Sequence, residues 1–299
     1  TSSTTISDGM GGVVVERVTF INSRGRSIVL SNQRPFILES VDGKGDVEAD
    51  VQMQSAPYQH GSGYIDTRLN PRYLTLRVAI LGDNPAEVAK LRQELTSVFN
   101  PTLGEGLIIY ENDFVKREIT GALESIPKFP TGRGNKLLRM QRALIHIVCP
   151  DPDWISATTH NYKLEDFVGN FRFPFHFPVR FATRGDGKTL VNNGDVPTPV
   201  KIEFRGPAYK PMITNMRTGE FIRVNTNIPV GHKLILNTEF GNKRVEIIKP
   251  NGDVENAFHY IDTSSTFFEL DVGESRISFL AESGTPEVYV EYKERYLSV

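Results

Sequence analysis

The sequence predicts a mainly β protein of two domains, and three observations lead to this prediction. The chain has 299 residues, which is more than one hydrophobic core usually spans and favours two domains. Apolar and polar residues alternate along most of its length, as they do in half-buried strands. Helical spacing of apolar residues stands out in one segment, between Asn84 and Pro101.

The first half predicts a β-sandwich-like domain over residues 1–160. A β-branched and aromatic run from Val13 to Ile21 precedes the turn residues 22–25 and the apolar run Ser27–Leu30, which is the pattern of a β-hairpin. Apolar residues alternate with others over Leu74–Ile80, so this strand should bury one face. Further strands are expected at residues 106–110, 116–126 and 136–148.

A single helix is expected to pack on this domain. Asn84 can cap it, Pro85 suits the first helical position, and Glu87 stands three residues after the cap, as in a capping box. Asn100-Pro101 ends the helix. Four apolar residues share one helical face and should cover a sheet: Val88, Leu91, Leu95 and Val98.

The second half, residues 161–299, predicts a β-sandwich of jelly-roll type. A break falls at residues 151–159, where two prolines and small polar residues gather. Phenylalanines then recur at every second position from Phe171 to Phe177 beside prolines, which favours an edge or junction strand. Short strands separated by turns follow. We expect them at residues 201–204, 212–215, 220–224, 233–236, 244–248, 267–270, 275–280 and 288–292.

Charge and cysteine content argue against several classes of function. Lys plus Arg number 34 and Asp plus Glu 36, a net charge of −2, whereas a nucleic-acid binder normally has a basic excess. The densest basic stretch, Arg133 to Arg142, is interpreted as the solvated side of a strand. The single cysteine, Cys149, allows no internal disulfide, fits assembly in a reducing cytoplasm and should be a buried, inert thiol.

The sequence predicts neither a membrane anchor nor export. No stretch approaches the roughly 18 apolar residues of a membrane span. The N-terminus lacks the basic and apolar regions of a signal peptide.

No catalytic, cofactor-binding or metal-binding residue is predicted. Residues 182–189 fit a relaxed phosphate-loop pattern, but Leu190–Pro197 after them cannot form the helix that phosphate binding requires. The six histidines have no metal-ligand spacing, and no nucleophile elbow is present. A catalytic pair among the scattered carboxylates stays open as an alternative, although nothing selects one, and the prediction is that the protein is not an enzyme.

Binding of host glycans is the competing function. Sugar sites commonly use exposed Trp or Tyr rings, but the only tryptophan, Trp154, lies at the domain junction and is expected to be a packing anchor. Half-buried strand positions are the alternative interpretation of the tyrosines. The candidates in the second half are Tyr209, Tyr260, Tyr289, Tyr292 and Tyr296.

From about Val13 to Leu297 the chain resembles the distal tail proteins (Dit) of siphophages, tailed phages with long non-contractile tails. The resemblance depends on the order and spacing of several motifs, with a partial match at Asp271–Ser275. The motifs are Phe99-Asn100-Pro101, Gly104-Glu105-Gly106, residues 126–130, 148–154 and 173–178, Asn192–Asp195, Gly206, Asn215–Gly219 and Tyr289–Leu297.

This resemblance implies a structural virion protein at the distal tail tip, assembled in the host cytoplasm. It implies a homo-hexameric ring formed by the N-terminal domains, with galectin-like C-terminal sandwiches projecting outward. The implied partners are the tail tube protein, a tail-associated hub or lysin protein and, in some members, a receptor-binding protein. Genomic DNA would pass through the lumen without specific binding.

A closed ring requires a head-to-tail interface, and we expect exposed hairpins of the N-terminal domain to supply it. The loop Asp42–Gly63, rich in glycine and polar residues, is one candidate contact arm. Thr131–Asn135 is the second.

Overall fold

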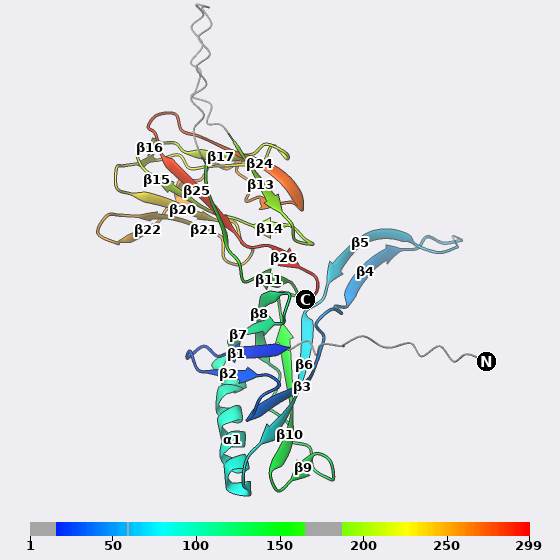
Figure 1. Cartoon of the computed structure of the whole chain (residues 1–299). Coiled ribbons are helices and arrows are strands. Elements are labelled where there is room, and N and C mark those ends of the chain that lie inside the picture. The colour runs from blue at the N-terminus through cyan, green and yellow to red at the C-terminus, as the bar shows by residue number, and fades with distance from the viewer. Residues whose placement is uncertain (1–15, 59, 165–186) are drawn as a thin grey trace, which may run out of the picture. The chain divides into compact units, whose positions relative to one another are not determined.

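The computed structural model describes residues 16–58, 60–164 and 187–299. It divides into two compact units, the first comprising Thr1–Ile155 with Leu297–Val299 and the second Ser156–Tyr296. Strands dominate both units (Figure 1), which confirms the mainly β prediction. The phenylalanine run Phe171–Phe177 and most of the phosphate-loop-like segment lie outside the described residues.

The first unit is built on one bent antiparallel sheet with the strand order β2-β1-β7-β8-β10-β6-β3. A bridge between Ser31 and Ile37 joins the ends of β2 and β3, so the sheet curls back on itself. Alternate residues of β10 are buried, as period two requires. The strands are β1 (Arg17–Ile21), β2 (Ser27–Leu30), β3 (Phe36–Asp42), β6 (Arg72–Leu81), β7 (Glu105–Glu111), β8 (Lys116–Leu123), β9 (Lys136–Leu137), β10 (Met140–Cys149) and β11 (Trp154–Ser156).

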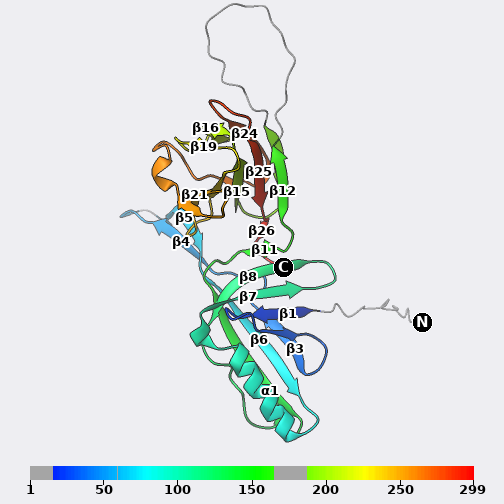
Figure 2. The same cartoon turned by 90° about the vertical axis from the view of Figure 1, so that its left-hand side faces the viewer.

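Helix α1 (Pro85–Val98) packs on this sheet as predicted (Figure 2). The Asn84 side chain accepts a 2.9 Å hydrogen bond from the Glu87 N–H, and the Glu87 carboxylate accepts one of 2.7 Å from the Asp83 N–H. Beyond the helix, the Phe99 ring stacks on Phe20 with centroids 4.5 Å apart. A 3-10 turn, η1 (Pro101–Leu103), follows.

Two local expectations are wrong. The segment Asp42–Gly63 is not a loop, because β4 (Ala49–Gln54) pairs with β5 (Gly63–Leu69) in an antiparallel hairpin. Residues 136–148 are not one strand, because a turn separates β9 from β10. Of the four basic residues interpreted as one side of a strand, Arg142 lies in β10, and Arg133, Lys136 and Arg139 lie in the preceding loop, β9 and the turn.

The second unit is a sandwich of two antiparallel sheets, ordered β12-β25-β15-β20-β21-β22 and β13-β24-β17-β18. Their facing residues form one core, including Ile202, Phe204, Phe279 and Val290. The sheet strands are β12 (His160–Leu164), β13 (Lys188–Asn192), β15 (Lys201–Arg205), β17 (Met212–Asn215), β18 (Phe221–Arg223), β20 (Lys233–Asn237), β21 (Arg244–Ile248), β22 (Val254–Asn256), β24 (Gly273–Leu280) and β25 (Glu287–Tyr292). The short elements are β14 (Thr198–Pro199), β16 (Ala208–Tyr209), β19 (Asn227–Ile228), η2 (Phe258–Tyr260), β23 (Glu269–Leu270) and β26 (Arg295–Tyr296).

Candidate functional site

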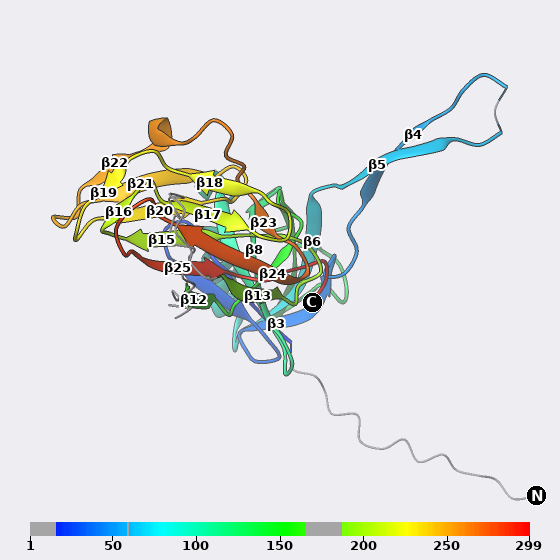
Figure 3. The same cartoon turned by 90° about the horizontal axis from the view of Figure 1, so that it is seen from above.

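The β4–β5 hairpin projects from the first unit and is the most exposed regular structure in the described chain. We call residues 46–58 and 60–69 the arm. Every residue of β4 is exposed, and in β5 only Asp66 is partly buried. Figures 1 and 3 show both strands extending away from the sheet that contains β3 and β6. Such a hairpin is marginally stable by itself in water, so a covering surface would stabilise the arm.

One face of the arm is apolar. Along β4, Ala49, Val51 and Met53 alternate with polar residues, and Met53 pairs with Tyr64 on β5. Met53 and Tyr64 are 63% and 67% exposed. Period-two alternation normally marks a strand with one covered face. The arm therefore presents a core-like face that its own unit does not cover.

The root of the arm is fixed by Arg72, which is 1% exposed. Its guanidinium donates to the carbonyl oxygens of Gly43 (2.8 Å), Lys44 (3.0 Å) and Leu297 (2.6 Å), and Nε donates to that of Pro152 (2.7 Å). Burial lowers the pKa of Arg72. Hydrogen bonds to four carbonyl oxygens offset the free-energy cost of burying the cation. No sequence signal pointed to Arg72, since an arginine next to a proline carries no sign of burial.

Lys44 and Trp154 complete the root. The Trp154 indole N–H donates a 3.0 Å hydrogen bond to the Lys44 carbonyl oxygen, so Trp154 is the packing anchor that the sequence predicted. The Lys44 ammonium lies 2.5 Å from the Glu16 carboxylate, which also accepts from the Tyr110 hydroxyl. Burial opposes ionisation of Glu16, but these hydrogen bonds outweigh it and lower its pKa. The root of the arm is therefore held in place by several hydrogen bonds, while the arm itself is exposed.

The second predicted contact segment, Thr131–Asn135, is an exposed loop before β9. The C-terminal end of this loop is fixed, because the Arg142 N–H donates a 2.8 Å hydrogen bond to the Asn135 carbonyl oxygen. The Gln141 side chain donates to the carbonyl oxygens of Pro130 and Asn135. Asn135 of this loop lines a shallow pocket with Glu39, Arg77, Pro130, Arg142 and Leu144.

The tyrosines proposed for glycan binding do not gather into one platform. Tyr292 is 3% exposed and Tyr260 packs against the core of the second unit. The Arg205 guanidinium covers the Tyr289 ring at 4.3 Å, and the Tyr296 hydroxyl is bonded to Glu294. Tyr209 is 39% exposed but has the Lys210 ammonium over its ring.

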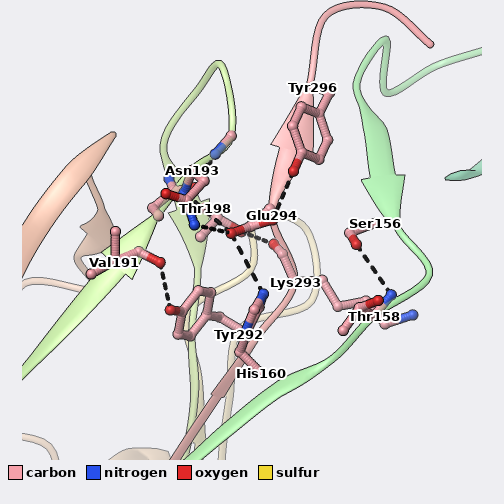
Figure 4. A network of polar contacts seen from close by, with 12 residues as sticks. Ser156, Thr158, His160, Val191, Asn193, Thr198, Tyr292, Lys293, Glu294 and Tyr296 are labelled. Atoms are coloured by element: carbon pink, nitrogen blue, oxygen red, sulfur yellow. Dashed lines mark hydrogen bonds and ion pairs between the residues drawn. The ribbon is translucent and has the colours of Figure 1, made fainter. Parts of the chain in front are cut away.

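A buried polar network in the second unit holds its first and last segments together (Figure 4). The Glu294 carboxylate, 7% exposed, accepts from the Asn193 backbone and side chain and from the Tyr296 hydroxyl at 2.7 Å. His160 lies 3.5 Å from the same carboxylate. Burial acts to raise the pKa of Glu294, but the Tyr296 and Asn193 hydrogen bonds outweigh it, and the pKa is lowered. These contacts are structural.

The other sequence candidates show no reactive chemistry. Cys149 is buried, and burial raises the pKa of its thiol to about 12. His146 contacts the Thr75 hydroxyl at 3.2 Å. Among residues 16–58, 60–164 and 187–299, no three His, Cys, Asp or Glu side chains gather as metal ligands would. Within those same ranges, no helix is long and apolar enough to cross a membrane.

Two models of phage tail protein domains match parts of this chain. Residues 193–296 match the siphovirus-type tail component C-terminal domain, and residues 23–135 match the phage tail protein RIFT-related domain. Comparison with curated proteins gave no significant match.

Two solved structures share the fold. The SPP1 Dit protein, described as a paradigm of the hub adsorption apparatus in phages infecting Gram-positive bacteria, has a TM-score of 0.68 at 13% identity, over 93% of this chain and 98% of that one. A chain of the phage P2 baseplate, in its activated conformation with Ca, has a TM-score of 0.55 at 10% identity, over 96% and 100%.

The protein is thus a structural component of a phage tail or baseplate, which places it in the virion tail. Within that class, the two matched domains and their order assign the chain to the siphophage distal tail protein (Dit) family.

Proposed function

We propose that six copies of this chain form a closed ring that joins the tail tube to the baseplate hub and lets genomic DNA pass through its centre. The observation that carries the proposal is the arm, a rigidly rooted hairpin with an apolar face that its own unit does not cover. A ring needs a head-to-tail contact between two different surfaces of the subunit, and a projecting arm suits one half of it.

We further propose that the role is not enzymatic, because both matched domains are structural tail components. A net charge of −2 suits a channel that does not hold DNA by tight phosphate contacts. We further propose that the chain assembles in the host cytoplasm and that its partners are the tail tube and hub proteins, with a receptor-binding protein as a further candidate.

The test is the mass of the purified full chain by light scattering, with negative-stain images of the same peak. The proposal predicts six-fold mass and rings with an open centre, formed alone or on addition of tube and hub proteins. In the comparison variant a Gly-Ser-Gly-Ser linker replaces residues 48–70. The linker can span the gap because Asp42 of β3 pairs directly with Thr75 of β6.

The variant should fold and remain monomeric. Absence of rings from the natural chain even with both partners would overturn the proposal, and glycan binding would be tested next. No feature of Tyr209, Tyr260 or Tyr289 favours that second function, because each ring is partly buried or has a neighbouring side chain over it.

A further inference from the structure

The β9–β10 turn carries two exposed leucines beside the start of helix α1. Leu137 and Leu138 are 59% and 80% exposed. The turn is fixed in place, because the Gly82 N–H, just before α1, donates a 3.0 Å hydrogen bond to the Arg139 carbonyl oxygen. Two-residue hairpin turns favour Gly, Asn and Asp, whereas this one places Leu138 and Arg139 between the paired residues Leu137 and Met140. Turn chemistry therefore does not account for the exposed leucine.

Both leucines line a groove of about 630 Å³ between the turn and α1, which we call the α1–β9 groove. Pro85, Val88 and Ala89 of the helix line its other side. An exposed apolar surface rimmed by polar groups marks a site that another molecule covers. The groove is therefore a candidate docking site of the first unit.

The rim of the groove is basic. Lys136 lines the groove and Arg139 lies in the turn beside it, both exposed. Arg142 is paired with Glu39, but no ion pair joins Lys136 or Arg139 to any residue in the described part of the chain. From residue 126 to residue 149 the chain contains five Lys or Arg residues and no Asp or Glu. Two cations at the rim are thus available to a partner.

A third cation lies on the helix side. The Arg92 guanidinium lines the groove and lies 4.3 Å from the centre of the Phe129 ring. Its buried Nε has no hydrogen-bond partner among the described residues. A buried guanidinium nitrogen without an acceptor costs free energy, so an acceptor that a partner brings into the groove would be favourable.

This combination favours a protein segment over other anionic partners. Duplex DNA is held by cations that follow its phosphates, and exposed leucines contribute nothing to such contacts. A membrane surface takes up apolar side chains that protrude, whereas Arg92 lies inside the groove and needs an acceptor there. A segment with a carboxylate between aliphatic side chains supplies both the acceptor and the apolar surface.

We propose that the α1–β9 groove docks an acidic, apolar segment of a second tail protein. The aliphatic side chains of that segment lie on Leu137, Leu138 and Ala89, and its carboxylate faces Arg92 and Lys136. Apolar contact provides most of the affinity, and the opposite charges set the orientation of the segment. The inference rests on the proposed function, since it gives the subunit a docking site for one of its partners in the tail.

Photo-cross-linking in assembled virions tests which molecule occupies the groove. Leu138→p-benzoylphenylalanine is introduced into the full chain, the virions are irradiated, and the cross-linked peptides are sequenced by mass spectrometry. The expected product joins position 138 to a segment of another tail protein that has Asp or Glu beside Leu, Ile or Val. Cross-links to a second copy of this chain, to DNA or to a segment without a carboxylate would overturn the proposal, as would the absence of any cross-link.

Charge reversal then tests the contact in solution. A synthetic peptide with the sequence of the cross-linked segment is titrated into the purified full chain. Lys136→Glu with Arg139→Glu should weaken its binding at least about tenfold, and exchanging the peptide's acidic residue for Lys should restore affinity to this variant. Leu137→Ser with Leu138→Ser should also weaken binding, because apolar contact area is lost. Unchanged affinity in the charge variant would refute the docking.

A matched control carries the same charge change elsewhere in the first unit. Arg24→Glu with Arg26→Glu alters two exposed arginines of the turn between β1 and β2 and should leave peptide affinity unchanged. Circular dichroism and melting curves show whether each variant folds. Light scattering separates the docking from the ring. Peptide binding by a chain that never forms rings would leave only the ring proposal in question, and rings without peptide binding would overturn only the docking.

Discussion

Arg72 donates a 2.6 Å hydrogen bond to the carbonyl oxygen of Leu297, which lies 225 positions later in the chain. The same guanidinium holds Gly43 and Lys44 at the root of the arm. Gly43 fits there because its φ is +89° and a Cβ atom would lie 1.9 Å from the Tyr73 carbonyl oxygen. One buried cation therefore joins the C-terminal residues, the arm and strand β6 of the first unit.

Replacing Arg72 with Met should destabilise the first unit strongly. The substitution leaves four carbonyl acceptors without their donor, and we expect a loss of at least about 3 kcal/mol in the free energy of unfolding. Urea unfolding followed by fluorescence measures it, because Trp154 is the only tryptophan and lies beside Arg72. Arg77→Met, on the exposed face of the same strand, should change stability by less than about 0.5 kcal/mol. Equal effects of the two substitutions would refute the role given to Arg72.

Cys149 should react with iodoacetamide only when the first unit opens. Burial raises the pKa of its thiol to about 12, so little reactive thiolate forms at pH 8 in the folded state. We expect labelling at least about a hundredfold slower than in urea. Cys149 is the register partner of Arg72, so Arg72→Met should accelerate labelling. Rapid modification of the folded natural chain would contradict the burial of the thiol.

Glu294 should make the second unit sensitive to acid. Its pKa is lowered in the folded state, so its contribution is complete above the unfolded value near 4.5 and is lost as the pH falls through the folded value. Glu294→Gln should cost about 1–3 kcal/mol at pH 7 and flatten the stability profile below about pH 5.

Hydrogen exchange of peptides from the second unit, measured from pH 7 to pH 3 and corrected for the intrinsic pH dependence of exchange, would follow that loss. Glu274→Gln, at an exposed position of β24, is the control and should leave the profile unchanged. A Glu294→Gln profile as steep as that of the natural chain would show that another group is responsible.

The apolar face of the arm should matter for assembly and not for folding. Met53→Ser with Tyr64→Ser removes two side chains that are more than 60% exposed, so monomer stability should change by less than about 0.5 kcal/mol. The ring fraction measured by light scattering should fall, because apolar area that the contact would bury is lost. Phe114→Ser, at an 83% exposed position before β8, serves as the control. A large loss of monomer stability would mean that the arm packs on its own unit.

The sequence alone predicted the elements whose signals are local. Asn84, Pro85 and Glu87 defined the start of α1, and alternation defined β6 and most strands of the second unit, because capping and period-two burial act within a few residues. It also identified Trp154 as a packing anchor and the resemblance to distal tail proteins. The arm was taken for a loop, since its polar and glycine-rich composition concealed the alternation from Ala49 to Met53.

Contacts between residues far apart in the sequence emerge only in the folded chain. The burial of Arg72 depends on carbonyl oxygens from four separate positions, and no local pattern records where a backbone acceptor will lie. The apolar face of the arm is likewise set by the fold, because Met53 and Tyr64 become neighbours only when β4 pairs with β5.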